Sequence, residues 1–496
     1  MLSPVGEPMA AHSSKPPETC LNRPSIQRRA HRAALLCAAI LAGCSSLPVI
    51  TPDMARPDPA GIQFQTARGR IVSPERSREI IARLASGGGD SDVMARHLAL
   101  EQSIADSPLS LGNHVALLEN GPNTYAAMFD AIDSARDSIN METYILEADE
   151  TGQRFADVLI AKQAQGVQVN LIHDSVGTLA TPKAFFKRMA DAGISVLEFN
   201  PVNPLKAKAG WDVNQRDHRK LLVVDGRRAV LGGVNISSVY SSGGSASPSG
   251  SGGSRGPAAA TPPDSKALPW RDTDLFIEGP VVASLQKLFI DTWKDQKGPP
   301  LAAREYFPML TRQGDEVVRA IGSNPDEPFS QIYVTLISAL NSAESEILLT
   351  NAYFVPDPQL VKALTDAVAR GVDVKLIVPS TTDSSLVFHA GRSHYDPLLR
   401  GGVKIYERRA ALLHAKTVLI DGVWSTVGST NLDWRSFLHN QELTAVVLGS
   451  QFGVKMRASF ERDLAESNQI TLQAWERRPV GVRVKEAFAR LWEYWL

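Results

Sequence analysis

Two segments of the chain carry the same reactive side chains in the same order. Each has the pattern H-x-K-x4-D, formed by His218, Lys220 and Asp225 in the first copy and by His414, Lys416 and Asp421 in the second. One such pattern arises easily by chance, but two complete copies in corresponding places of an internal repeat do not. An imidazole can attack phosphorus or carry a proton, and a nearby lysine can bind an anionic oxygen. The pair of patterns therefore predicts one site that acts on a phosphodiester.

Small residues and an asparagine follow each pattern at the same distance. They are Gly232, Gly233 and Asn235 in the first copy and Gly428, Ser429 and Asn431 in the second. Histidine and lysine two residues apart on a strand point to the same face, so both can meet one ligand. Small turn residues also let the backbone approach an anion closely. The side chains predicted to bind the phosphate oxygens are Lys220, Lys416, Asn235 and Asn431.

Carboxylates stand where each imidazole needs one to fix its tautomer and leave the other ring nitrogen free. Asp272 follows the first pattern and Glu442 follows the second, with Asp274 as an alternative to Asp272. We include the motif aspartates, Asp225 and Asp421, among the catalytic candidates. Their position at strand ends favours a role in orienting hydrogen bonds over contact with substrate.

The two patterns lie at corresponding points of an internal repeat. The first repeat predicts a helix, a strand, a helix and two further strands at 125–136, 139–146, 155–163, 166–172 and 194–199. The second repeat predicts the same order at 330–342, 347–354, 359–369, 371–377 and 403–406. This alternation indicates an α/β fold, and the nearly continuous apolar strands suit a sheet covered on both faces.

These residues resemble the phospholipase D superfamily with its paired HKD motifs. Within it, residues 428–436 and 232–236 are similar to the bacterial cardiolipin synthases. The resemblance implies two similar α/β/α halves with pseudo-twofold symmetry and one active site at their interface. It also implies a phosphohistidine intermediate and no metal or other cofactor. It assigns His218 as the nucleophile, oriented by Asp272, and His414 as the general acid, oriented by Glu442; the reverse assignment is chemically equivalent.

The resemblance favours a phosphatidyltransferase that makes cardiolipin from phosphatidylglycerol, so the expected partners are an anionic phospholipid and a membrane surface. A first alternative uses water as the acceptor, as a phospholipase D or another phosphodiesterase such as a nuclease would. A net charge of −1 disfavours nucleic acid as the partner, because binding many phosphates needs a large basic field. A second alternative is a non-catalytic envelope scaffold, which two complete motifs argue against.

The beginning of the chain has the features of a lipoprotein signal peptide. Three arginines at 28–32 precede an apolar run at 33–42 and then Leu41-Ala42-Gly43-Cys44, so we expect residues 1–43 to be removed and Cys44 to be lipidated. Residues 44–75, rich in Pro, Ser, Thr and Asp, are expected to be a tether. The expected location is the periplasmic side of the outer or the inner membrane.

A chain of 496 residues with 43% hydrophobic residues is long enough for two domains. We predict a first half at 76–298, a linker at 299–310 and a second half at 311–496. The Ser-, Gly-, Ala- and Pro-rich stretch 241–263 is expected to be a disordered insertion. The C-terminal tail has an apolar helical stripe that could pack on the core or contact a membrane interface.

Overall fold

The computed structural model describes residues 70–85, 91–104, 108–203, 212–243, 268–409 and 411–496, together with 47, 49, 62 and 64–66. The predicted signal peptide, Cys44 and residues 244–263 of the predicted insertion lie outside the described residues, as does most of the predicted tether.

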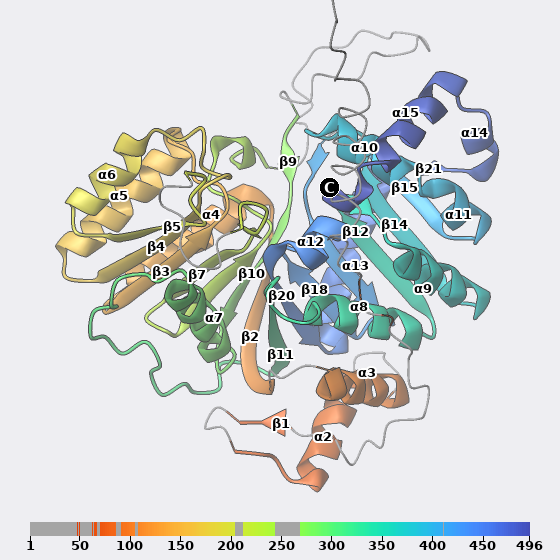
Figure 1. Cartoon of the computed structure of the whole chain (residues 1–496). Helices are drawn as coiled ribbons and strands as arrows, with labels where there is room; N and C mark the ends of the chain where they lie inside the picture. The colour runs from red at the N-terminus through yellow and green to blue at the C-terminus, as the bar shows by residue number, and fades with distance from the viewer. Residues whose placement is uncertain are drawn as a thin grey trace, which may run out of the picture. The chain divides into compact units, whose positions relative to one another are not determined.

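Two halves of the chain contain the same elements in the same order (Figure 1). The first half runs β2 (Leu109–Glu119), α4 (Asn120–Ser134), β3 (Ser138–Thr143), α5 (Glu150–Ala164), β4 (Gln168–Asp174), α6 (Lys183–Asp191), β5 (Ser195–Phe199), β7 (Lys220–Val224), β8 (Arg228–Gly232), β10 (Thr273–Glu278) and α7 (Val282–Asp295). The second runs β11 (Glu316–Ser323), α8 (Gln331–Ser342), β12 (Glu346–Asn351), α9 (Pro358–Ala369), β14 (Asp373–Pro379), α11 (Tyr395–Arg400), β15 (Lys404–Arg408), β17 (Lys416–Ile420), β18 (Trp424–Gly428), β20 (Asn440–Leu448) and α13 (Ser450–Ala465). The repeat predicted from the sequence is therefore present.

The two halves also have the same strand order. The first half is ordered β5-β4-β3-β7-β8-β10-β2, and the second β15-β14-β12-β17-β18-β20-β11. Strands β2 and β11 pair antiparallel, with Val317 opposite Leu111 and Val318 opposite Ser110. Equivalent strands that meet antiparallel are related by an approximate twofold axis, so the predicted pseudo-symmetry runs through this junction.

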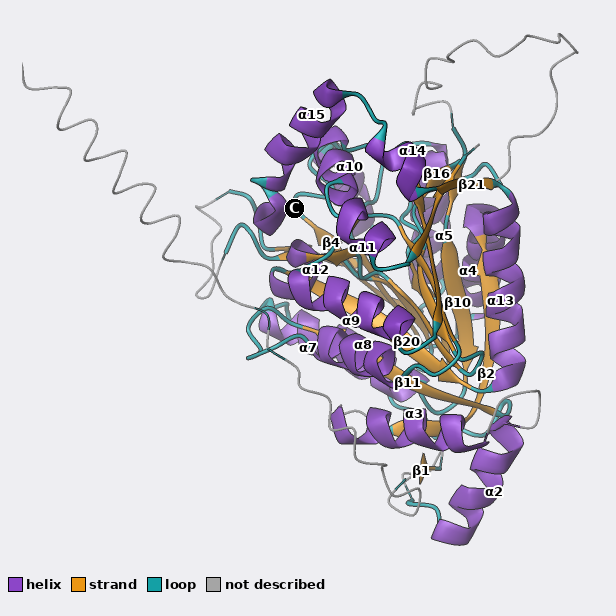
Figure 2. Ribbon diagram, turned by 90° about the vertical axis from the view of Figure 1, so that its right-hand side faces the viewer, coloured by secondary structure: helices purple, strands orange, loops and turns teal. Residues whose placement is uncertain are grey.

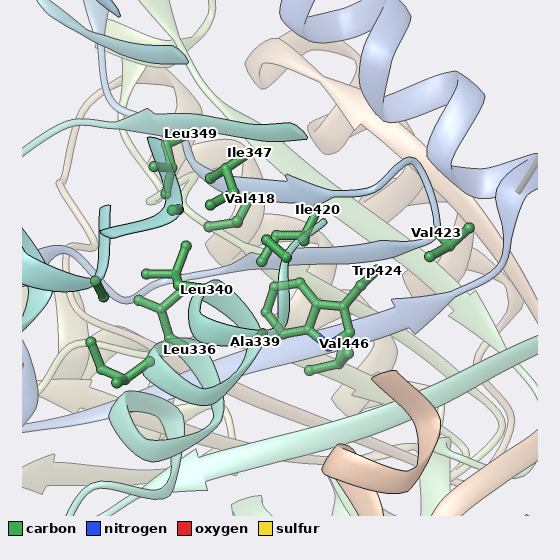
Figure 3. Packing of buried hydrophobic residues seen from close by; sticks show 14 of the residues in the cluster. Leu336, Ala339, Leu340, Ile347, Leu349, Val418, Ile420, Val423, Trp424 and Val446 are labelled. Atoms are coloured by element: carbon green, nitrogen blue, oxygen red, sulfur yellow. The ribbon is translucent and has the colours of Figure 1, made fainter. Parts of the chain in front are cut away.

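Side chains of the motif strands alternate between two apolar layers, as the period of a strand requires. In β7, Leu222 and Val224 pack with α4, α5 and α6, whereas Leu221 and Val223 face the cluster that contains residues of α7 and α13. In the second half, helix α8 packs with Val418 and Ile420 around the fully buried Trp424 (Figure 3). Each sheet is thus covered on both faces.

The N-terminal helices depart from the predicted domain boundary. The sequence places helices α2 (Pro74–Ala85) and α3 (Ser91–Ile104) in the first half, but their buried apolar residues belong to the core of the second half. Figure 2 shows α3 alongside α8 of that half. Glu101 accepts a hydrogen bond from Trp424 Nε1 at 2.7 Å and pairs with Arg319 at 3.0 Å. An amphipathic pattern shows which face of a helix is buried, but it does not show against which sheet or half that face packs.

The predicted tether and linker also have different limits in the structure. Within 44–75, β1 (Phe64–Gln65) pairs in parallel with β2, and Phe64 is fully buried, so the irregular tether cannot extend to residue 75. Between α7 and β11, residues 296–315 form no helix or strand, and they contain the predicted linker. None of the described helices combines the length and the apolar character that crossing a bilayer requires.

Candidate active site

Both motif histidines are held where the two halves exchange short strands. His218 follows β6 (Arg216–Asp217), which pairs in parallel with the start of β20, and its N–H donates to the carbonyl of Gln441 at 2.9 Å. His414 follows β16 (Leu412–Leu413), which pairs in parallel with β9 (Trp270–Arg271), and its N–H donates to the carbonyl of Arg271 at 2.8 Å. Each histidine is therefore fixed by a segment of the other half, and one site contains both.

This exchange corrects the predicted pairing of histidines and carboxylates. His218 Nδ1 lies 3.0 Å from Glu442 Oε1, and His414 Nδ1 lies 2.7 Å from Asp272 Oδ2. The sequence predicts the opposite pairs, His218 with Asp272 and His414 with Glu442. Because Glu442 and Asp272 directly follow the carbonyls that bind the histidine N–H groups, each carboxylate reaches the ring of the opposite half. A carboxylate on Nδ1 holds that nitrogen protonated and leaves Nε2 free for chemistry.

The glycines after the first motif make room for carboxylates, whereas we had expected them to make room for an anionic ligand. A Cβ atom on Gly232 would lie 1.8 Å from Asp274 Oδ1, and one on Gly233 would lie 2.2 Å from Asp272 Oδ1. Asp274, the alternative partner, instead accepts a hydrogen bond from the backbone N–H of Val234 at 3.1 Å. Asp272 is therefore the carboxylate that binds a histidine ring, and Asp274 stabilises the turn through a backbone hydrogen bond.

A serine replaces the second glycine in the other half and breaks the symmetry. Ser429 donates its hydroxyl proton to Glu442, which also accepts from Asn440 Nδ2 at 3.2 Å. Asp272 has no equivalent hydroxyl because Gly233 stands at that position. The two histidine–carboxylate pairs therefore differ in their surroundings, although the motifs are alike.

The motif lysines are buried beside the histidines. Lys220 Nζ donates to the carbonyl of His218 at 2.6 Å, and Lys416 Nζ donates to the carbonyl of His414. Burial lowers the pKa of Lys220 to about 7 and also lowers the pKa of Lys416. A bound phosphodiester anion would counter this effect and favour the charged lysines.

The two asparagines differ from each other and from the prediction. Asn235 is engaged within the protein: its Oδ1 accepts from the N–H of Ile145 at 3.1 Å, and its Nδ2 donates to Tyr240 at 3.0 Å. Asn431 is also buried, but among the described residues its Oδ1 has no hydrogen-bond partner. Because an amide oxygen accepts hydrogen bonds, this free Oδ1 cannot bind a phosphate oxygen, and phosphate binding by either asparagine stays a prediction.

The motif aspartates bind backbone N–H groups at the far ends of the motif strands. Asp225 accepts from the N–H groups of residues 136, 137 and 138 at 2.8–2.9 Å. Asp421 accepts from those of residues 344, 345 and 346 and lies 3.1 Å from His97 Nε2. Both residues have positive φ, 51° and 53°. Their role is structural, and their inclusion among the catalytic candidates needs correction.

Aromatic rings surround both histidines, and sequence analysis had missed them. The ring of Tyr144 lies 5.0 Å from that of His218, and the ring of Trp270 lies 5.2 Å from that of His414. Tyr240 places its hydroxyl 3.4 Å from His414 Nδ1. Tyr144 lies in the predicted strand 139–146 and Tyr240 follows Asn235 closely, but no pattern marks either as part of a site.

The surroundings affect the protonation of the two histidines differently. Burial, followed by the charges of Lys220 and Lys416, holds the pKa of His218 well below its usual value. Burial also lowers the pKa of His414, but the Asp272 carboxylate opposes this shift. Burial raises the pKa of Glu442 to about 7, whereas the charges of His414 and Lys416 outweigh burial and lower the pKa of Asp272. A proton is therefore better held on His414 than on His218.

The described residues contain no group of three or more His, Cys, Asp and Glu side chains arranged to hold a metal ion. The expectation that the reaction needs no cofactor stays a prediction.

The segments that carry this site are similar to known proteins. The family description "Cardiolipin synthase, PLD-like domain" matches residues 128–241 and 336–464, which contain both HKD motifs. The cardiolipin synthase of Geobacillus sp. (strain WCH70) is 34% identical over 397 residues, which are 79% of this chain and 74% of that protein. Cardiolipin synthase 2 of Bacillus anthracis is 31% identical over 425 residues, 85% of this chain and 75% of that protein.

A solved structure has the same fold. The phosphatidylserine synthase of Haemophilus influenzae Rd KW20 superposes with a TM-score of 0.57 at 14% identity, covering 81% of this chain and all of that one. The predicted α/β fold with two phospholipase D-type halves is thereby confirmed. The prediction of a phosphatidyltransferase of this superfamily is also confirmed. From its paired motifs and its extended similarity to these relatives, the chain belongs to the cardiolipin synthase family of PLD-like proteins.

Proposed function

We propose that the protein makes cardiolipin from two molecules of phosphatidylglycerol by way of a phosphatidyl-histidine. The observation that supports this most is the pair of buried histidines, each with Nδ1 bound to a carboxylate of the opposite half. This arrangement leaves two Nε2 atoms for reaction, and two buried lysines lie beside them for the phosphate oxygens. A two-step transfer through one phosphorus atom needs these groups.

In the first step, the lone pair of His218 Nε2 attacks the phosphorus of phosphatidylglycerol. The bond between phosphorus and the glycerol oxygen breaks, and His414 Nε2 gives its proton to that oxygen. In the second step, His414 Nε2 takes the proton from a hydroxyl of the second phosphatidylglycerol. The hydroxyl oxygen attacks phosphorus, the phosphorus–nitrogen bond breaks, and His218 is restored.

The assignment of roles follows from the different surroundings of the two rings. A nucleophile needs a neutral Nε2, and His218 is the histidine whose pKa is held furthest below its usual value by burial. A general acid must hold a proton, and the ionised Asp272 supports that proton on His414. The predicted roles of the histidines are therefore retained, with their carboxylate partners exchanged.

The test is turnover by purified protein on vesicles of phosphatidylglycerol, with lipids and released glycerol measured by mass spectrometry. The proposal expects equal amounts of cardiolipin and glycerol, and no product from His218→Ala. Phosphatidic acid as the main product would identify water as the acceptor and the protein as a hydrolase.

We further infer that the protein is held at the cell envelope by a lipid on Cys44 and faces the periplasm. The inference relies on the arginines, apolar run and Leu41-Ala42-Gly43-Cys44 of the sequence. Cys44→Ala is expected to lose the lipid-modified N-terminal peptide in mass spectrometry while turnover in detergent micelles stays unchanged. An unmodified Cys44 in the wild-type protein would refute this anchor.

A further inference from the structure

The C-terminal helix presents its large apolar side chains to solvent. We call this set the C-terminal stripe. It comprises Val480, Val484 and Phe488 of α15 (Val480–Arg490), Leu491 and Trp492 directly after that helix, and Trp495 of η5 (Glu493–Trp495). Val484 is 63% exposed, Phe488 59% and Leu491 77%. Of the two alternatives left open by the sequence, packing on the core is therefore wrong for these side chains.

Helix α15 is attached to the protein by its opposite face. There Glu486 is buried and pairs with Arg478 at 2.9 Å and with Arg392 of α10 (Ser385–Arg392) at 3.7 Å. Ala489 packs against Ala390 of α10 in a small apolar cluster. Amphipathic helices of globular proteins usually bury the apolar face, and here a charged and small face is buried instead. An apolar surface exposed in this way is typical of an interaction site.

Basic side chains flank the stripe. At 3.6 residues per turn, Arg483 and Arg490 lie on one side of the stripe and Lys485 on the other, and all three are exposed. The exposed carboxylate of Glu476 in the preceding helix α14 (Leu472–Glu476) is paired with Arg400 at 2.8 Å. An apolar face with cations along its edges and aromatic residues at one end fits an anionic lipid surface.

The stripe is connected to the rim of the active site. The carbonyl of Leu496 accepts a hydrogen bond from the N–H of Arg435 in α12 (Trp434–Leu438) at 3.0 Å. The rings of Trp495 and His439 are nearly parallel, with their centroids 6.5 Å apart. The carbonyl of His439 in turn accepts from the N–H of Arg216, two residues before His218. In both views α15, α10 and the strands next to the histidines lie at the end opposite α2 and α3 (Figures 1 and 2).

We propose that the C-terminal stripe docks the protein on an anionic phospholipid bilayer, with the active site next to the lipid headgroups. This inference rests on the proposed function in one respect, namely that the substrate is a bilayer lipid. Docking would bring the headgroup phosphate to the histidines while the acyl chains stay in the membrane, so the site does not need to extract a whole lipid.

The test uses the full chain with Cys20, Cys37 and Cys44 changed to Ser, so that no lipid anchor contributes. A polarity-sensitive fluorophore is attached at Phe488→Cys, and in a matched control at Val454→Cys, which replaces an apolar residue of α13 that is 60% exposed. Vesicles contain phosphatidylcholine alone or phosphatidylcholine and phosphatidylglycerol in equal amounts. We expect a blue shift at position 488 with the mixed vesicles, a smaller one with phosphatidylcholine alone, and none at position 454.

A second measurement compares co-sedimentation with the mixed vesicles. Phe488→Glu with Leu491→Glu is expected to weaken partition about tenfold or more, and Lys485→Glu about fivefold or more, whereas Val454→Glu has no effect. No shift at position 488 would overturn the proposal. A shift that appears without vesicles and grows with protein concentration would also overturn it, because a second copy would then cover the stripe.

The two proposals can fail separately. If the C-terminal stripe enters the mixed vesicles but the protein makes no cardiolipin, the docking proposal stands and the proposed function is refuted. If the protein makes cardiolipin in detergent micelles but the fluorophore at position 488 stays in water when vesicles are added, the proposed function stands and the docking proposal is refuted.

Discussion

Asp272→Asn tests whether the carboxylate contributed by the opposite half determines the catalytic role of each histidine. Asp272 is fully buried and lies 2.7 Å from His414 Nδ1, so it is the charge that most directly opposes the lowering of the His414 pKa by burial. Asparagine keeps the size of the side chain but removes this charge. We expect His414 to lose its proton at a lower pH and to fail as the general acid for the glycerol leaving group.

The expected magnitude follows from the loss of one general acid and of its orientation. General acid–base catalysis contributes about 10²–10⁴ in rate. We therefore expect kcat on phosphatidylglycerol to fall by about that factor, or by about 3–5 kcal/mol in activation free energy. A phosphatidyl ester of p-nitrophenol needs no acid for its departure. With that substrate the first burst of nitrophenol should remain within about tenfold of the wild-type rate, and later turnover should stall.

Glu442→Gln is the matched control because Glu442 orients the nucleophile. It should slow the burst with both substrates, since His218 Nε2 must attack phosphorus whatever the leaving group. Stopped-flow absorbance of nitrophenol and quenched-flow lipid analysis would measure both steps. A slow burst in Asp272→Asn, together with a normal burst in Glu442→Gln, would refute the assignment of Asp272 to the acid and Glu442 to the nucleophile.

Three other predictions concern stability, pH and metal. Asp421→Ala should lower the free energy of unfolding by about 1–3 kcal/mol, because the backbone N–H groups of residues 344–346 lose their acceptor. The kcat of the folded protein should stay unchanged, and denaturant titration with an activity assay of the folded fraction checks both expectations. Asp274, whose pKa burial raises to about 7, binds more protons folded than unfolded between about pH 4 and 7, so its contribution to stability falls as pH rises through that window. Asp274→Asn should therefore raise Tm at pH 8 and leave it unchanged at pH 3, and equal Tm changes at both pH values would contradict this. Excess EDTA should leave turnover intact because Lys220 and Lys416 supply the positive charge; a loss restored by one divalent ion would disprove it.

Most of the fold could be predicted from periodicity and repetition. The strand of Leu221 to Val224 and that of Thr417 to Ile420 are apolar at almost every position, which indicates a sheet covered on both faces, and the structure agrees. The receiving surface of α2 and α3 could not be predicted, because amphipathic helices of this kind fit many apolar sheets. Periodicity also found the stripe of α15, but could not show that this face points outward.

The reactive residues of the site could be predicted, but not which of them act together. Both histidines and both lysines follow from the spacing of the motifs, because two residues along a strand return to the same face. The partners of the histidines depend on the pairing of β6 with β20 and of β9 with β16, which forms only when the halves dock. Chain order suggested a carboxylate that follows the motif in the same half, Asp272 for His218 and Glu442 for His414, and docking reverses that choice.

Trapping the covalent intermediate would test the proposed mechanism directly. His414→Ala protein, incubated with the phosphatidyl ester of p-nitrophenol, should accumulate a phosphatidyl group on His218, because no base remains to activate the acceptor. Peptide mass spectrometry under mildly basic conditions, which preserve a phosphorus–nitrogen bond, would locate the adduct. We expect the adduct on His218 and none in His218→Ala. An adduct on His414 in the His218→Ala protein, or none in either variant, would contradict the proposed mechanism.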